Sequence, residues 1–399
     1  MANLLYLVHR IPFPPNKGDK IRSFHWLKHL ARKHRIYLGT FVDDPADWDH
    51  VKTLGEYCEE VVAIPLNPLW GRLKSLRGLT SGDPLTLPYY ANSRMKRWAQ
   101  SVVEEKSIDA VFVFSSAMAQ FVDPDWECVK IIDFVDVDSD KWHQYAQSKP
   151  FWSAWIYRRE GDRLLQYDRA IAGCFDRSLF VTQAEAGLFR KLAPEVADQV
   201  DFVENGVDLE YFQGSREFSN PYHPGEQVFV FTGAMDYWAN VDAVRWFADQ
   251  VFPELLQHHV EARFYIVGAR PTETVKALGR REGVVVTGSV PDIRPFLAHA
   301  RLAVAPLRIA RGIQNKVLEA MAMSKSVLTS SMAMDGLEAP EDLDLEVSDD
   351  PEAMINIALR TLRERAYLPR FSPSNRRFVE MRYSWDSHLE SLDGFLATL

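Results

Sequence analysis

VAPLRIARGIQNKVLEAMAM, residues 304–323, reads as a buried strand, then a loop rich in arginine and glycine, then a helix. Gly312 permits a close approach of the backbone, and the start of the helix directs the positive end of its dipole at the loop. Arg308, Arg311 and Lys316 add cationic side chains. This combination predicts an anion-binding corner suited to a diphosphate.

Glu319 follows Lys316 by about one helical turn. A carboxylate at that position can accept two hydrogen bonds from the hydroxyls of a ribose. The stretch is therefore compatible with a nucleotide site. The alternative interpretation is an ordinary helix start with solvated charges, in which Lys316 and Glu319 form a surface pair.

Short apolar runs alternate with segments of helical apolar spacing along the rest of the chain. Such alternation predicts parallel sheets that helices cover on both faces. A polar stretch at 218–227 interrupts the rhythm, so we expect two doubly wound α/β domains. The expected strands are Leu4–Val8, Ile36–Val42, Val61–Ile64, Ala110–Phe114, Lys130–Phe134, Ser178–Val181, Val228–Thr232, Ala262–Val267, Gly283–Thr287, Leu302–Pro306 and Ser326–Thr329.

Composition and missing motifs exclude several classes. The 399 residues are 47% hydrophobic and 25% charged, which is typical of a globular protein, and the net charge of −9 argues against a nucleic-acid binder. Three separated cysteines argue against disulfides or a zinc site and fit the cytoplasm. No apolar run is long enough for a signal peptide or a membrane span. The dinucleotide fingerprint, P-loop, HExxH and GxSxG motifs are absent.

The first domain contributes two candidate segments. Pro14–Asp19 follows the first strand, and in it Lys17 could contact a phosphate while Gly18 permits close approach. The equally weighted alternative is a turn in which Asp19 caps the following helix. Asp136 belongs to a group of acids after the strand ending at Phe134, where a carboxylate could orient an acceptor hydroxyl or take its proton. Loop solvation is the alternative, and the group lacks the glycine turn and bidentate glutamate of a calcium loop.

Residues 10–35 hold eight Lys and Arg but one acid, and Trp70–Arg77 is a second basic and apolar segment. In a chain of net charge −9, this asymmetry suits anionic lipid headgroups or a lipid diphosphate acceptor. A solvated helix face is the alternative interpretation. The basic residues of the first segment are Arg10, Lys17, Lys20, Arg22, Lys28, Arg32, Lys33 and Arg35.

The chain resembles the GT-B glycosyltransferases, specifically the retaining family 4 group, over nearly its whole length. Residues 304–323 resemble the nucleotide-sugar site of that group. The other similar passages are Val203–Asp208 followed by Tyr211-Phe212, Phe229–Gly233, Gly288–Asp292 with Ala300 and Ala305-Pro306, and Tyr383–Trp385. More narrowly, Thr232–Trp238 and Asp133–Trp142 resemble a bacterial subgroup associated with exosortase (PEP-CTERM) exopolysaccharide systems.

The resemblance implies an α/β fold of GT-B type, with two doubly wound Rossmann-like domains facing across a cleft. Residues 1–205 would form the acceptor-side domain and 206–374 the nucleotide-sugar-binding domain. Residues 375–399 would form a helix that packs back on the first domain.

The resemblance also implies site roles. Glu319 would bind the ribose, and Arg311, Lys316 and the Gly312 backbone would hold the diphosphate. The backbone near Val290 and Asp292 would read the base. Gly233 would form a glycine turn, and Gly18 and Lys17 would lie in the loop that approaches the donor.

Two departures from the family pattern concern charge. The family often carries two glutamates with seven residues between them, and the first of these positions is Arg311 here. The arginine and lysine that often follow the glycine of the first C-terminal strand are absent from Ala234–Ala239. Arg311, Lys316 and Arg308 would then have to compensate.

We therefore expect a retaining glycosyltransferase that transfers a sugar from a UDP- or GDP-linked donor to a saccharide or lipid-linked hydroxyl acceptor, in exopolysaccharide biosynthesis. No metal or other cofactor is expected to be required, and no nucleic acid is expected as a partner. The protein would be cytoplasmic and could contact an anionic membrane peripherally. The alternatives are a GT-B nucleotide-sugar epimerase and a degenerate GT-B binding protein.

Overall fold

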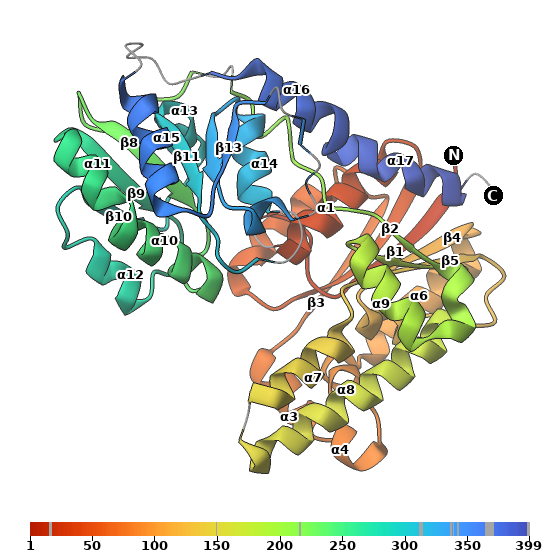
Figure 1. The fold of residues 1–399 in the computed structure, drawn as a ribbon. Coiled ribbons are helices and arrows are strands. Elements are labelled where there is room, and N and C mark those ends of the chain that lie inside the picture. Colours follow the sequence, from red (N-terminus) through yellow and green to blue (C-terminus); the bar gives the residue numbers. More distant parts are fainter. Residues whose placement is uncertain are drawn as a thin grey trace. The chain divides into compact units, whose positions relative to one another are not determined.

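The computed structural model describes residues 1–15, 18–148, 150–214, 217–310, 314–335, 337, 339–340, 343–363 and 371–396. The chain divides into two units (Figure 1). The first is Met1–Asn205 together with His388–Leu399, and the second is Gly206–Ser387.

The first unit is built on a seven-stranded parallel sheet with the order β3-β2-β1-β4-β5-β6-β7. The strand order reverses between β1 and β4, and ligands of open α/β sheets bind at the carboxyl ends of strands at such a point. The strands are β1 Asn3–Val8, β2 Arg35–Val42, β3 Glu60–Pro65, β4 Ala110–Phe114, β5 Val129–Val135, β6 Arg177–Phe180 and β7 Val200–Phe202.

Helices cover this sheet because its central strands are apolar on both faces. Every residue of β4 is buried, and so are five of the six in β1. The helices are α1 Gly18–Ala31, α2 Val51–Leu54, α3 Pro68–Ser75, α4 Gly78–Ser81, α5 Thr86–Tyr90, α6 Ser93–Lys106, α7 Asp138–Ser148, α8 Phe151–Ala172 and α9 Gln183–Leu192. Short 3₁₀ segments are η1 Pro45–His50, η2 Ser116–Phe121 and η3 Pro194–Gln199.

The second unit has a six-stranded parallel sheet with the order β10-β9-β8-β11-β12-β13, which reverses between β8 and β11. The strands are β8 Gln227–Thr232, β9 Ala262–Val267, β10 Val284–Gly288, β11 Leu302–Ala305, β12 Val327–Thr329 and β13 Leu345–Val347. Its helices are α10 Trp238–Gln250, α11 Phe252–His258, α12 Glu273–Leu278, α13 Arg294–His299, α14 Asn315–Ala322, α15 Pro351–Arg363 and α16 Pro373–Arg382, with a 3₁₀ segment η4 at Met332–Met334.

The two doubly wound sheets confirm the predicted fold class. Every predicted strand is present, and the structure adds two more, β7 and β13. Each of these is three residues long and lies at a sheet edge. Asp201 and Glu346 interrupt their apolar runs, whereas the equally short β12 is fully buried, which is why the sequence pattern did not reveal β7 and β13.

The expected C-terminal segment 375–399 contains two helices rather than one. The first is α16, which packs on α14, and its Arg376 Nη1 donates to the carbonyls of Phe212 and Ala322 at 2.7 Å each. The second is α17, Trp385–Leu396, whose residues from His388 onward belong to the first unit. There Asp393 accepts from Lys33 Nζ at 2.6 Å and contacts His29 Nε2 at 3.2 Å.

Candidate functional site

Two glycines join the loops that follow β8 and β9 in the second unit. A Cβ atom on Gly268 would lie 1.7 Å from the carbonyl oxygen of Gly233, and both glycines have φ of +155°. Met235 N donates to Ala269 O at 2.8 Å, and Gly268 N donates to Gly288 O at 3.2 Å. The carboxyl ends of β8, β9 and β10 are thus bound together, and only glycine fits where the two loops meet.

Lys316 is held at this edge by a buried asparagine. Its Nζ donates to Asn240 Oδ1 at 3.0 Å, and Asn240 Nδ2 donates to Ala234 O at 2.9 Å. A Cβ atom on Gly233 would lie 3.5 Å from Lys316 Cε. The start of α14, the first turn of α10 and the Gly233 loop therefore converge where the strand order reverses.

Glu319 lies one turn further along α14. The alternative interpretation paired it with Lys316 on the surface, but the two form no ion pair in the described part of the chain. Burial raises the pKa of Glu319 to about 7, although the Lys316 charge lowers it in part. Burial likewise lowers the pKa of Lys316 to about 8, against the opposing influence of Glu319. Both groups are held in a partly desolvated environment, and the Glu319 oxygens accept no hydrogen bond from any described residue. Groups of this kind occur often at binding sites.

Asp292, a residue predicted to lie near the base, sits in a small polar cluster after β10. Arg294 Nη2 donates to Asp292 Oδ2 at 2.7 Å, and the Arg294 guanidinium lies 3.9 Å from the centre of the Tyr211 ring. Tyr211 Oη donates to Asp292 Oδ1 at 3.3 Å. Burial raises the pKa of Tyr211, and the carboxylates of Asp292 and Glu319 raise it further. The cluster and Glu319 therefore share one neighbourhood, whereas Val290 packs against the core.

The cations near the Gly233 loop differ from those expected. Arg308, predicted as a compensating charge, is bound by Asp242 of α10 through Nε at 3.0 Å and Nη2 at 2.5 Å. Arg270 was missed by the sequence analysis. It follows β9, has φ of +53°, and binds Asp236 of the β8 loop through Nε at 2.5 Å. Arg270 therefore places a positive charge beside the loop whose sequence lacks one.

In the first unit, Asp136 follows the end of β5 and is only partly buried. Lys141 Nζ lies 2.6 Å from Asp136 Oδ2 and 3.1 Å from Asp138 Oδ1. The neighbouring Asp133 has a different role, since it is buried and forms an ion pair with Arg22. Only one of these two acids thus remains accessible. No group of His, Cys, Asp and Glu with the arrangement of a metal site occurs in the described ranges.

Gly18 is the first residue of α1, and no atom lies within 4 Å of where its Cβ would be. The neighbouring Asp19, interpreted alternatively as a helix cap, lies in the first turn of α1, accepts from Arg10 Nη1 at 2.6 Å and lies 3.5 Å from His9 Nε2. Burial would raise the pKa of Asp19, but His9 and Arg10 lower it well below its ordinary value. The His9 ring stacks on Phe114 at the end of β4. This pair lies where the first sheet reverses its order, and the sequence contained no signal for it.

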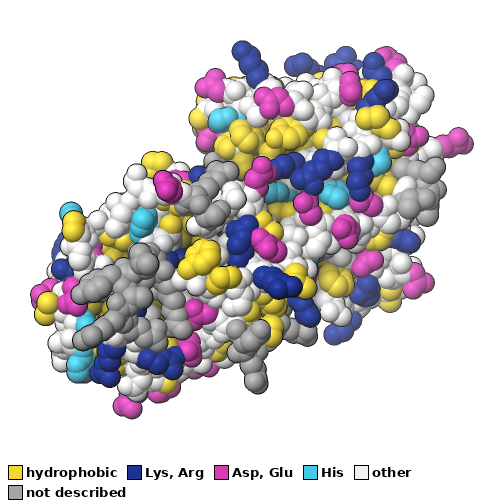
Figure 2. Space-filling view, turned by 90° about the horizontal axis from the view of Figure 1, so that it is seen from above, with side chains coloured by type: hydrophobic (Ala, Val, Ile, Leu, Met, Phe, Trp, Pro, Cys, Tyr) yellow, Lys and Arg dark blue, Asp and Glu magenta, His cyan; other side chains and the backbone are white. Residues whose placement is uncertain are grey.

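The basic stretch at residues 10–35 does not form the free cationic face that we expected for lipid headgroups. Lys20 pairs with Asp47 and Arg22 with Asp133, and all four side chains are buried. Arg10 is held by Asp19 and Asp43, Lys33 by Asp393, and Lys28 and Arg32 are partnered too. Figure 2 likewise shows basic side chains interspersed with acidic ones on the face it presents.

Three predicted site residues, Lys17, Arg311 and Gly312, lie outside the described residues.

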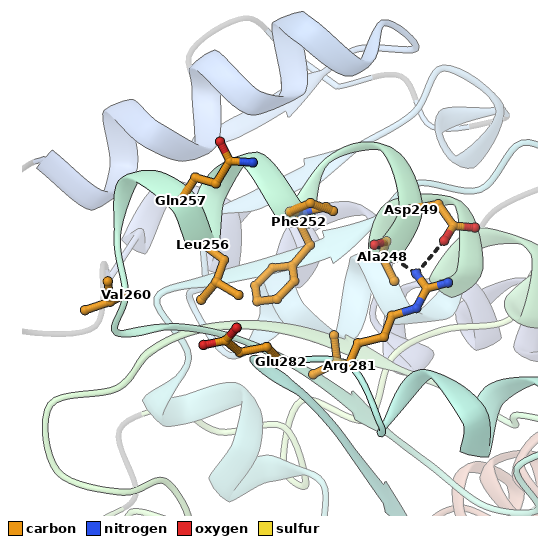
Figure 3. Close-up of a pocket in the computed structure, with 10 residues that line it drawn as sticks. Ala248, Asp249, Phe252, Leu256, Gln257, Val260, Arg281 and Glu282 are labelled. Carbon is orange, nitrogen blue, oxygen red and sulfur yellow. Dashed lines mark hydrogen bonds and ion pairs between the residues drawn. The ribbon is translucent and has the colours of Figure 1, made fainter.

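The second unit also has a pocket of about 480 Å³ (Figure 3). One of its lining residues, Val284, is the first residue of β10, so the pocket lies at the amino ends of the strands, whereas Lys316 lies at their carboxyl ends. In that pocket, Phe252 and Leu256 of α11 point toward the loop that carries Arg281. This pocket is therefore not part of the candidate site.

None of the described helices combines the length and apolar character that a membrane crossing needs.

Comparisons with known proteins agree with this architecture. Residues 226–364 match the family model of the group 1 glycosyl transferases. Three similar solved structures are HepE from Anabaena with UDP and glucose (13% identity, TM-score 0.64, all of both chains), WaaG, a glycosyltransferase involved in lipopolysaccharide biosynthesis (16%, 0.63, 98% of each chain), and sucrose-phosphate synthase from Thermosynechococcus elongatus (15%, 0.62, 100% of this chain and 99% of that one). No curated protein sequence matches the chain.

The second unit thus carries a group 1 glycosyltransferase domain, and the protein is a glycosyltransferase. Its two parallel-sheet units, matched over their full length by the solved structures, have the GT-B fold.

Proposed function

We propose that this enzyme transfers a sugar from a nucleotide diphosphate sugar to a hydroxyl acceptor, with retention of configuration and in exopolysaccharide biosynthesis. The environment of Glu319 is the observation that supports a nucleotide sugar as the donor. Its carboxylate accepts no hydrogen bond from any described residue and lies one turn from Lys316 at the point where the second sheet reverses. Paired ribose hydroxyls fit such an acceptor.

Lys316 is the cation that this proposal places on the diphosphate. Asn240 orients its ammonium group, and burial lowers its pKa to about 8, so it is still mainly charged at neutral pH. A cation that is already positioned stabilises the charge that develops on the leaving diphosphate. The Gly233 loop beside it lets backbone approach the phosphates, and Arg270 adds charge at the edge of that loop.

The remaining predicted residues keep their proposed roles. Asp292 would lie beside the base, with Arg294 and Tyr211 fixing its position. Arg311 and Gly312 would extend the diphosphate site. Asp136 would act on the acceptor side of the first unit, where Lys17 and Gly18 would border the donor. No metal is needed in this scheme, since the side-chain cations supply the positive charge.

UDP is the nucleotide that we propose. HepE has been solved with UDP, with UDP and glucose, and with UDP-glucose, and its fold spans the whole of this chain. The guanosine alternative expected from the sequence has no such support. The narrower assignments, to family 4 and to the exosortase-associated subgroup, rest on the sequence resemblance alone.

Calorimetric titration with UDP, GDP, ADP and dTDP tests the donor site. We expect UDP to bind, and Glu319→Ala to weaken its binding by about 10-fold or more, because two hydrogen bonds to a charged group are lost. Glu273→Ala is the matched control, since Glu273 is an exposed carboxylate on α12 of the same unit. Equal UDP affinity in Glu319→Ala and wild type would contradict the proposed site. Sugar transfer from UDP-glucose that requires an added acceptor distinguishes a transferase from an epimerase.

A further inference from the structure

Five large apolar side chains are exposed within one short part of the first unit. Leu69, Trp70, Leu73, Leu76 and Leu79 have exposed fractions of 70%, 65%, 58%, 56% and 38%. They lie on α3, on α4 and, in the case of Leu76, between the two helices, which follow the carboxyl end of β3. Single exposed leucines are ordinary on a protein surface, but a contiguous group of them marks an interaction site.

The local geometry explains why these side chains face outward. Leu69, Leu73 and Leu76 recur at the spacing of one helical face. Gly71 lies on the opposite face, and its missing Cβ leaves room for the Tyr89 ring, which would otherwise come within 2.6 Å. Helix α3 therefore packs on α5 at Gly71, and its leucine face stays largely exposed among the side chains that the structure describes.

The segment is held firmly rather than loosely attached. Asn67 caps the start of α3, where its Oδ1 accepts from Leu69 N at 2.9 Å. The buried Glu160 of α8 accepts from Leu85 N at 2.7 Å. Arg159 of α8 donates to the carbonyl oxygens of Gly78 and Asp83. The apolar face is thus presented in a fixed orientation, and its exposure is a built feature of the unit.

The charged residues within residues 66–82 are all basic, and the exposed Asp83 follows them directly. Arg72, Lys74 and Arg77 are all exposed, and residues 66–82 contain no acid, in a chain whose net charge is −9. Trp155, one turn before Arg159 on α8, adds an aromatic side chain with an exposed fraction of 54%. Leucine and tryptophan beside Lys and Arg are the composition of a surface that inserts among anionic lipid headgroups.

We infer that α3, α4 and Trp155 form a docking surface for an anionic lipid bilayer. The leucines and tryptophans enter the boundary between headgroups and acyl chains, while Arg72, Lys74 and Arg77 contact the lipid phosphates. This surface lies outside the basic stretch at residues 10–35, in which ion pairs hold Arg10, Lys20, Arg22 and Lys33.

The surface also bears on the acceptor. Tyr89 contacts Gly71 from α5, and the adjacent Tyr90 packs edge-on against His9, which follows β1. One short run of packed side chains thus joins the docking surface to the edge where Asp19 lies. We infer further that the acceptor hydroxyl belongs to a molecule held in the lipid bilayer. This step rests on the proposed function.

Cosedimentation of the full-length protein with lipid vesicles tests the inference. We expect binding to phosphatidylcholine vesicles that contain phosphatidylglycerol, and little binding to phosphatidylcholine alone. Leu69→Ser with Leu73→Ser should weaken binding by about 10-fold or more. Exchanging Arg72, Lys74 and Arg77 for Gln should weaken it by about five-fold per charge at low salt. Val260→Ser, at an exposed fraction of 78% in the second unit, is the matched control and should bind like wild type.

Two outcomes would overturn the inference. One is that the wild-type protein does not bind anionic vesicles even at low salt. This includes the case in which the protein forms a dimer that the Leu69→Ser/Leu73→Ser variant abolishes, because a second copy would then cover the docking surface. The other is unchanged vesicle binding in that variant. UDP titration of the same proteins separates this result from the proposed function, since the docking variants should bind UDP normally and Glu319→Ala should still bind vesicles.

Discussion

Arg22 Nε donates to Asp133 Oδ2 at 2.6 Å, joining the middle of α1 to β5 through two side chains that are almost completely buried. Arg22 Nη1 also donates to Val203 O at 2.7 Å and Asn205 Oδ1 at 2.9 Å. One guanidinium group therefore links the first helix, a central strand and the last residues of the first unit's main segment.

Removing the carboxylate of Asp133 should destabilise the protein strongly. Asp133→Ala leaves the Arg22 charge buried without its partner, which typically costs about 3–5 kcal/mol. Chemical denaturation measures the change. Asp136→Ala is the control, because Asp136 is partly exposed and its loss should change stability by less than about 0.5 kcal/mol. If Asp136 acts on the acceptor, the same control variant should lose transfer activity while remaining stable.

Gly268→Ala should be among the most damaging small substitutions in the second unit. The added Cβ would lie 1.7 Å from Gly233 O, so the β8 and β9 loops must separate. We expect a loss of stability of about 3 kcal/mol or more, together with loss of UDP binding. Thermal unfolding and calorimetry measure the two effects. Gly187→Ala on α9 should instead stabilise by about 0.5–1 kcal/mol, because its Cβ meets nothing within 4 Å. Equal melting temperatures for the two variants would contradict this account.

Glu319→Gln should raise stability while it weakens UDP binding. Burial raises the pKa of Glu319 to about 7 in the folded protein, above its ordinary value, so this group favours folding below the unfolded pKa, and the benefit is lost as pH rises through about 7. Glutamine cannot ionise. The variant should therefore be more stable than wild type by about 1 kcal/mol near pH 8, after allowance for solvent screening, and equal to it near pH 4. Chemical denaturation of both proteins at pH 4 and pH 8 measures this difference in stability. If the variant were more stable than wild type only at pH 4, the prediction would be wrong.

UDP affinity of the wild-type enzyme should pass through a maximum between pH 7 and 8. Ribose hydroxyls donate to an ionised carboxylate, so affinity should rise as Glu319 loses its proton near pH 7. The diphosphate needs a charged ammonium, so affinity should fall as Lys316 deprotonates near pH 8. Titration across this range measures the profile. In Lys316→Met the upper limb should vanish, and an unchanged upper limb would assign it to another group.

Arg270→Met should weaken UDP binding several-fold, because it removes the positive charge beside the Gly233 loop. Arg308→Met should have a similar effect if Arg308 exchanges Asp242 for a phosphate. Arg360→Met is the control, since Arg360 is an exposed arginine that pairs with Glu346 beyond the site loops. The three affinities should fall into two groups, and a loss in Arg360→Met equal to the others would indicate a nonspecific effect of net charge.

Local sequence was sufficient for much of the fold and for the spacing of two residues of the candidate site. The strands from Leu4–Val8 to Ser326–Thr329 were predictable because central strands of parallel sheets are continuous apolar runs. Lys316 and Glu319 were recognisable because four consecutive positions of one helix determine their spacing. Neither β7 nor β13 could be found in this way, since an acidic residue interrupts each of these short edge strands.

What only the tertiary structure decided is which charges are available. The sequence shows Arg22, Lys20 and Asp133 as surface-like charges in basic or acidic runs, yet all three are buried in ion pairs whose partners lie 27 to 111 residues away. Arg270 and Asn240 likewise reach the Gly233 loop from other elements. The outward leucine face of α3 depends on Gly71 meeting Tyr89. Periodicity reports the local backbone, whereas ion pairing and exposure depend on contacts between distant residues, which only the folded chain creates.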